Sequence, residues 1–148
     1  MDPSVPKAVT VSQASRALRD AIRALDHAHT SLKIAQAANE EAEALWSDWG
    51  RQHPEPASKR GRRRWIRRTD IERQALTSKP WQALMRAELV FATAQCEVAL
   101  VPITGPADLH GMAVASAKYD RVELARGNRS PIGLMVATEL ALGSAVQS

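Results

Sequence analysis

Residues 10–49 read TVSQASRALRDAIRALDHAHTSLKIAQAANEEAEALWSDW, and this stretch decides the fold. Every seventh residue from Val11 onward is mostly large: the series is Val11, Leu18, Leu25, Leu32, Asn39 and Trp46. The series three positions later is alanine up to its last member: Ala14, Ala21, Ala28, Ala35, Ala42 and Trp49. Apolar residues at this alternating spacing of four and three form the seam of a coiled-coil helix. We therefore expect one long helix over residues 10–49, with Thr10 as its N-cap.

The remaining sequence favours helices over strands, which makes all-α the predicted fold class. Strict alternation of apolar and polar residues, the pattern of a half-buried strand, is nowhere sustained. Residues 79–101 repeat the seam of the first helix, with large residues at Leu84, Phe91 and Val98. We expect these two helices to pack against each other in antiparallel orientation. Pairing of the first helix between two chains is the alternative arrangement, and the sequence does not separate the two.

A short helix is expected between the two long ones. The sequence Thr69-Asp-Ile-Glu72 matches a capping box, so a helix should begin at Thr69. It should end near Thr77, because Pro80 is tolerated only in the first turn of a helix. Pro80 would then lie in the first turn of the helix over residues 79–101.

Proline and serine also place the last two helices. Pro106 and the Ser130-Pro131 pair predict helices over about 107–125 and 131–146, because serine suits the N-cap and proline the first helical position. Together with the middle helices, they predict a helical bundle over residues 69–148.

The chain of 148 residues is long enough for one structural domain with a single core. Residues 1–9 are expected to form a flexible arm, since prolines interrupt them. Residues 50–68, GRQHPEPASKRGRRRWIRR, are expected to form a linker, because glycine and proline recur and a basic run follows. The predicted organisation is therefore arm, long helix, basic linker and bundle.

The basic run is the feature that bears most on function. Between Arg51 and Arg73 stand nine basic residues against three acidic ones, a local net charge of +6. The densest part contains the candidate nucleic-acid-binding residues Lys59, Arg60, Arg62, Arg63, Arg64, Trp65, Arg67 and Arg68. Clustered cations neutralise phosphates and release condensed counterions, and a tryptophan can stack on an unpaired base. The alternative partners of these cations are an acidic protein or an anionic membrane surface. The cations could also pair within the chain, with Glu40, Glu41 and Glu43.

The long helix also offers a candidate protein–protein interface, and we expect homo-oligomers. The candidate residues are Leu18, Ala21, Leu25, Ala28, Leu32, Ala35, Trp46 and Trp49. Paired tryptophans can be hot spots of an interface. Alternatively, Trp46 and Trp49 form an apolar plug where the long helix meets Trp81.

Signatures of enzymes are missing from the sequence. No zincin, nucleophile-elbow, Walker A or dinucleotide-binding spacing occurs, and His27 and His29 are too close in sequence to chelate one metal from a helix face. We therefore predict no catalytic residues, no cofactor and no metal site. The single cysteine, Cys96, is expected to be a small core residue. With neither a signal peptide nor an apolar run of membrane-spanning length, the chain is expected to be cytoplasmic.

The segment VPITGPADLHGM at residues 101–112, followed by Lys118, resembles part of small bacterial helical proteins often encoded near mobile elements. Those proteins carry a P-A-x-T-L-x-G-L-x-x-K pattern, from which this chain departs at Asp108 and in the position of its lysine. The resemblance implies a bacterial or phage origin and no particular activity. The sequence as a whole predicts a non-enzymatic accessory protein that holds nucleic acid through its basic linker, or else a protein–protein adaptor.

Overall fold

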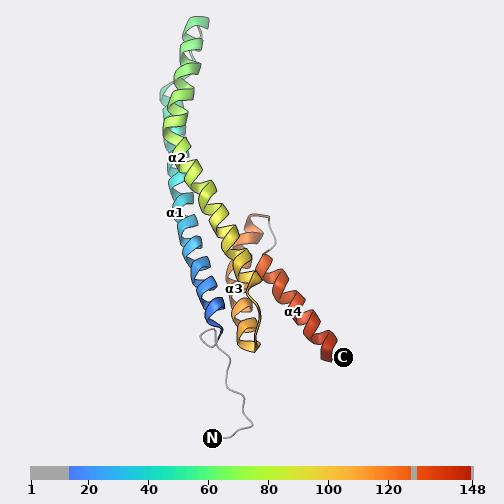
Figure 1. Cartoon of the computed structure of the whole chain (residues 1–148). Coiled ribbons are helices and arrows are strands. Elements are labelled where there is room, and N and C mark those ends of the chain that lie inside the picture. The colour runs from blue at the N-terminus through green and yellow to red at the C-terminus, as the bar shows by residue number, and fades with distance from the viewer. Residues whose placement is uncertain (1–13, 128–129, 148) are drawn as a thin grey trace. The chain divides into compact units, whose positions relative to one another are not determined.

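The computed structural model describes residues 14–127 and 130–147, and four α-helices account for most of them (Figure 1). The helices are α1 (Arg16–Gln52), α2 (Lys59–Leu100), α3 (Pro106–Ala125) and α4 (Pro131–Gln147). No strand occurs within these ranges, so the predicted all-α fold class is confirmed. The arm expected over residues 1–9 and the cap expected at Thr10 lie outside the described residues.

The helices are divided between two compact units. Unit 1 consists of residues Met1–His27 and Phe91–Ser148, and unit 2 consists of residues Ala28–Val90. Helices α1 and α2 each contribute to both units, whereas α3 and α4 belong to unit 1 alone.

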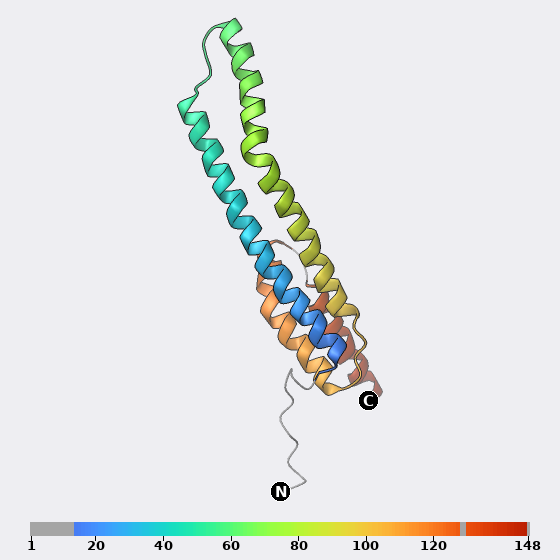
Figure 2. The same cartoon turned by 60° about the vertical axis from the view of Figure 1, so that its left-hand side comes forward.

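Unit 2 is an antiparallel helical hairpin. The second part of α1 and the first part of α2 lie side by side in both views, joined by residues 53–58 (Figures 1 and 2). The seam predicted for the first helix faces inward here, because Ala28, Leu32, Asn39 and Ala42 are buried. The expected antiparallel packing of two long helices is therefore present within a single chain, as two helices with matching apolar seams would pack.

The predicted linker over residues 50–68 is wrong in its extent, since most of it is helical. Helix α1 continues through Gly50 to Gln52 and ends where Pro54 disfavours a helical conformation for the residue before it. Helix α2 begins at Lys59 because Ser58 acts as its N-cap, with the hydroxyl oxygen accepting a hydrogen bond from the Gly61 N–H at 3.1 Å. Only residues 53–58 form the connection.

The predicted boundary near Thr77 is also wrong. Helix α2 runs without interruption from Lys59 to Leu100, and both the capping box at Thr69–Glu72 and Pro80 lie inside it. A proline inside a helix removes one hydrogen bond and costs about 3 kcal/mol. The inward-facing side of α2 continues on both sides of Pro80, with half-buried residues at Leu76 and Leu84. Packing along this side offsets the local cost, so the helix continues.

Unit 1 holds the main apolar core, to which all four helices contribute. Its fully buried large side chains are Leu18, Leu25, Phe91, Val98, Met112, Tyr119 and Ile132. Helix α1 approaches α3 closely at Gly111, where an added Cβ would lie 3.2 Å from the Leu18 side chain. Helices α3 and α4 meet at Gly133, where an added Cβ would lie 3.1 Å from the Ser116 hydroxyl. The prediction that the long first helix packs with the later helices is confirmed.

The ends of the last two helices match the sequence signals. Pro106 occupies the first turn of α3, and the Ser130 hydroxyl caps α4 by accepting a hydrogen bond from the Gly133 N–H at 3.3 Å. Cys96 differs from expectation, because its side chain is exposed on α2 instead of buried in the core. The apolar seam of α2 passes through Phe91, Ala94 and Val98, and Cys96 lies off this seam.

Candidate functional site

The basic residues of the predicted linker lie on the first three turns of α2, in unit 2. All seven cations are exposed: Lys59, Arg60, Arg62, Arg63, Arg64, Arg67 and Arg68. Because the segment is helical, the spacing of these cations is fixed by a rise of 1.5 Å per residue. We call these seven residues the cationic segment.

The helix separates the cations from the residues that face α1. Gly61, Trp65 and Thr69 are half-buried and recur at the spacing of one helical turn, so they form the inward side of α2. The remaining positions of the first three turns carry the cations, which project into solvent. The arrangement is that of a helix with one packed side and a strongly positive outer surface.

Ion pairs neutralise little of this charge. The Arg62 guanidinium binds the Glu55 carboxylate, with Nε to Oε1 at 2.9 Å. The Arg68 Nη2 lies 3.5 Å from Nε2 of His53. Across residues 14–127 and 130–147, no ion pair joins the other five cations to a carboxylate, and none joins the cationic segment to the acidic stretch Glu40–Glu43. The structure therefore does not bring together the intramolecular pairs that the sequence left as an alternative.

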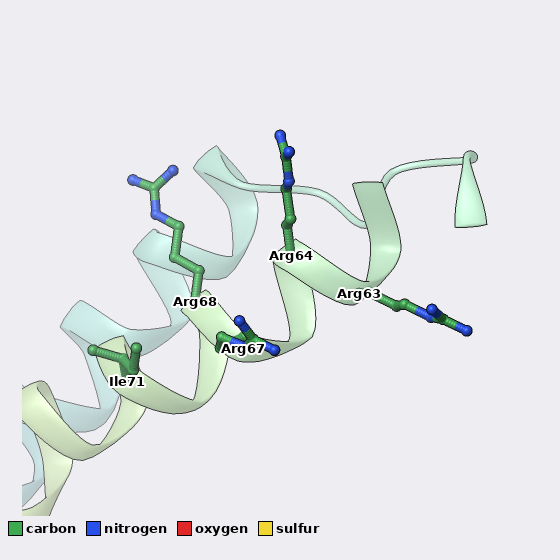
Figure 3. Close-up of a pocket in the computed structure, with 5 residues that line it drawn as sticks. All are labelled: Arg63, Arg64, Arg67, Arg68 and Ile71. Atoms are coloured by element: carbon green, nitrogen blue, oxygen red, sulfur yellow. The ribbon is translucent and has the colours of Figure 1, made fainter. Parts of the chain in front are cut away.

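Four of the arginines surround a shallow hollow on the outer surface of α2. It has a volume of about 280 Å³ and is lined by Arg63, Arg64, Arg67, Arg68 and Ile71. Figure 3 shows that Arg64 and Arg68 point to the same side of the helix, whereas Arg63 projects away from them. Ile71 is 62% exposed and adds an apolar side chain to the lining. Guanidinium groups in this arrangement can contact phosphate oxygens from several directions.

Trp65 packs against the chain, whereas the cations beside it project into solvent. Its indole is half-buried, and its Nε1–H donates a hydrogen bond of 2.7 Å to the backbone oxygen of His53. This bond ties the start of α2 to the end of α1 and closes the hairpin. Trp65 thus holds the cationic segment in place. Because the indole is half-buried, it has less surface for the base stacking that the sequence suggested.

Three rings stack along the last turns of α1. The Trp46 and Trp49 rings are 5.2 Å apart with an interplanar angle of 10°, and the Trp49 and His53 rings are 4.4 Å apart at 14°. The stacking fixes the orientation of each ring. Trp46 also lines a second hollow in unit 2 together with Trp81 of α2. Trp81 is 54% exposed, so the expected meeting of the tryptophans does not form a closed apolar plug.

The candidate interface residues of the long helix are largely covered within the chain. Leu18, Leu25, Ala28 and Leu32 are buried. The half-buried members of the set are Ala21, Ala35, Trp46 and Trp49. A second chain would have to displace intrachain contacts to reach the buried leucines. Homo-oligomerisation through this seam therefore stays a prediction.

Sequence reasoning did not place two contributors to this region on one helix. Arg73 and Trp81 lie farther along α2 and line the same hollow as Trp46. The sequence predicts Arg73 in a short helix over 69–77 and Trp81 in the helix over 79–101, whereas both lie on the single helix α2. Ser58 would have revealed the start of α2, because a serine directly before a basic run is a good N-cap.

Within the part of the chain that the structure describes, no three His, Cys, Asp or Glu side chains come together as metal ligands. None of the described helices is both long enough and apolar enough to cross a membrane. Comparisons of the chain with protein-family models, with curated proteins and with solved structures give no match.

Proposed function

We propose that the protein is a non-enzymatic accessory protein that holds nucleic acid without sequence specificity through the cationic segment of α2. The observation that supports it best is that all seven cations are exposed and six of them have no carboxylate partner among the described residues. Binding of phosphates to such a surface releases counterions from the nucleic acid and gains free energy. Phosphate contacts carry no sequence information, so the binding is non-specific.

The composition of the segment supports nucleic acid over an acidic protein. Six of its seven cations are arginine. The guanidinium group is planar and donates to two oxygens at once, which suits phosphate, and its face stacks on bases. The proposal places the protein in the cytoplasm of a bacterium or of a phage-infected cell.

The test is binding to fluorescently labelled 20-nucleotide DNA and RNA, single- and double-stranded, across a salt series. The variant combines Arg63→Gln, Arg64→Gln and Arg67→Gln, which removes three unpaired cations and keeps a good helix former at each position. Loss of three phosphate contacts should make the slope of log K against log salt shallower by about 2–3.

The matched control combines Arg19→Gln, Arg23→Gln and Arg121→Gln. These three arginines are exposed residues of unit 1, so the control changes the net charge by the same amount. The control should retain the wild-type slope. Absence of wild-type binding at low salt, or equal slopes for the two triple variants, would overturn the proposal.

A second candidate function, that of a protein–protein adaptor or assembly subunit, is favoured by the exposed apolar surface of α4. Leu134, Leu140 and Leu142 are each more than half exposed, and Glu139 is the one charged residue in the sequence of α4. Exposed apolar patches of this kind mark interaction surfaces. Light scattering of the wild type beside a Leu134→Glu, Leu142→Glu variant tests it. A wild-type oligomer that the variant loses would support an assembly role through α4.

A further inference from the structure

A hollow between the two arms of unit 2 lies on the same helix as the cationic segment. It has a volume of about 560 Å³, within the range of small-molecule sites. Its lining residues come from both arms: Asn39, Glu43, Trp46 and Ser47 of α1, and Arg73, Thr77, Ser78 and Trp81 of α2.

The aromatic walls of this hollow differ in how firmly they are held. The Trp46 ring is stacked on Trp49 and so has a fixed orientation. Trp81 is 54% exposed, which is unusual for the largest apolar side chain. The Trp81 side chain is therefore partly open to solvent where it lines the hollow. Any nucleobase can stack on such a ring, because every base has a π-face.

The charged groups of the hollow lie on opposite arms, with Glu43 on α1 and Arg73 on α2. Arg73 is exposed and forms no ion pair within residues 14–127 and 130–147, so its guanidinium can bind a phosphate. On the α1 side, the Nδ2 group of the buried Asn39 donates to Oε1 of the exposed Glu43 at 3.4 Å. The carboxylate repels phosphate and can accept hydrogen bonds from the N–H groups of a base. The charges therefore favour a base on the Glu43 side of the hollow and its phosphate on the Arg73 side.

The cationic segment and the hollow lie along the same helix. Arg63 and Trp81 are both residues of α2 and are 18 positions apart, which is about 27 Å along the helix axis. A single strand that follows α2 from the arginines would reach the hollow within about ten nucleotides, a usual site size for single-strand binding.

We propose that the hollow lined by Trp46, Arg73 and Trp81 accepts an unstacked base, so that the ligand of the cationic segment is a single-stranded nucleic acid. This inference rests on the proposed function and adds the class of nucleic acid to it. A base inside a duplex is paired and stacked and cannot enter the hollow without being flipped out. The cationic segment alone would bind both forms.

The test compares a labelled 12-nucleotide single strand with a 12-base-pair duplex at one salt concentration, using full-length protein. Trp81→Leu removes the ring at an exposed position and should leave the fold unchanged, which circular dichroism checks. It should weaken binding of the single strand about tenfold or more and leave duplex binding unchanged. Trp81→Tyr keeps an aromatic face and should retain most of the single-strand affinity.

The outcomes separate this inference from the proposed function. If Trp81→Leu has no effect, or weakens both ligands equally, while the Arg63, Arg64 and Arg67 variant still weakens both, the hollow is not a base site and the cationic segment remains the binding element. If wild-type protein prefers the duplex, the inference is overturned as well. If it binds neither ligand, both proposals fall.

Discussion

The phenol of Tyr119 on α3 donates a hydrogen bond to the carboxylate of Asp26 on α1. The same carboxylate accepts a hydrogen bond of 2.9 Å from the ammonium group of Lys118. Tyr119 is buried, and its ring packs edge-on against Phe91 of α2 at 5.7 Å. One side chain thus connects three helices of unit 1.

This relationship predicts an unusual titration of Tyr119, the single tyrosine of the chain. Burial, and then the Asp26 carboxylate, raise the pKa of Tyr119 well above its usual value of 10.0. The folded protein should therefore show no tyrosinate absorbance as the pH passes 10, whereas the protein in urea should titrate there. Absorbance at 295 nm measures both curves.

The raised pKa also gives the sign of the pH dependence. The stabilisation from neutral Tyr119 is fully present below pH 10 and is lost as the pH rises through the folded-state pKa. Tyr119→Phe, which removes the hydrogen bond to a charged acceptor, should lower the free energy of unfolding by about 1.5–3 kcal/mol. Identical titration of the folded and urea-unfolded protein would contradict this account.

Asp108 predicts an acid-dependent loss of stability. Its buried carboxylate accepts hydrogen bonds from the Thr104 hydroxyl at 2.6 Å and from the Ser15 N–H at 2.7 Å. The bond from Thr104 first, then that from Ser15, lowers the pKa of Asp108 from 3.8 to about 2. The resulting stabilisation is present above pH 3.8 and is lost as the pH falls through about 2.

Replacement of this carboxylate tests the assignment by urea denaturation. Asp108→Asn presents an amide N–H group to donors and should lower the free energy of unfolding by about 1–3 kcal/mol at pH 7. The difference from wild type should shrink between pH 4 and pH 2. Asp70→Asn, at an exposed position of α2, is the control and should change little. A difference that stays constant with pH would speak against the assignment.

Two helical glycines should respond differently to alanine. At Gly50 of α1 nothing lies within 4 Å of an added Cβ, so Gly50→Ala should stabilise the protein by about 0.5–1 kcal/mol through helix propensity. At Gly111 the added Cβ would press on the buried Leu18. Gly111→Ala should therefore lose most of that gain, and Gly111→Val should destabilise by about 1–3 kcal/mol. Thermal unfolding of the three variants provides the comparison, and equal gains from both alanines would refute it.

Pro80 is expected to weaken α2. Because it lies inside the helix and cannot donate a hydrogen bond, Pro80→Ala should raise the free energy of unfolding by about 1–3 kcal/mol. Urea denaturation measures the change. Pro102, which follows the end of α2, is the control, because Pro102→Ala adds no helical hydrogen bond. A destabilised Pro80→Ala protein would mean that the proline is needed for the packing of α2.

The parts of the fold that follow from local chemistry were predictable from the sequence. The repeat of Leu18, Leu25 and Leu32 identifies the buried side of α1, because residues seven positions apart lie on the same side of a coiled-coil helix. Pro106 and Ser130 mark the starts of α3 and α4 because proline and serine have strong positional preferences.

The parts that depend on tertiary packing were not predictable in the same way. Gly50, Gly61 and Pro80 each favour a break in a helix, yet all three lie inside helices of the structure. Packing between the arms of unit 2 outweighs these local preferences, and no single window of sequence contains both arms. The sequence identifies the cations, but their place on the same helix as Trp81 follows only from the continuous α2.

The shared seam of the hairpin couples the lengths of its two arms. Insertion of one residue into α2 would rotate every later side chain by about 100° and would leave α1 without its facing partners. Only additions of seven residues, made in both arms together, preserve the seam. Homologous hairpins should therefore vary in length by steps of two turns, and free variation should be confined to the loop at residues 53–58.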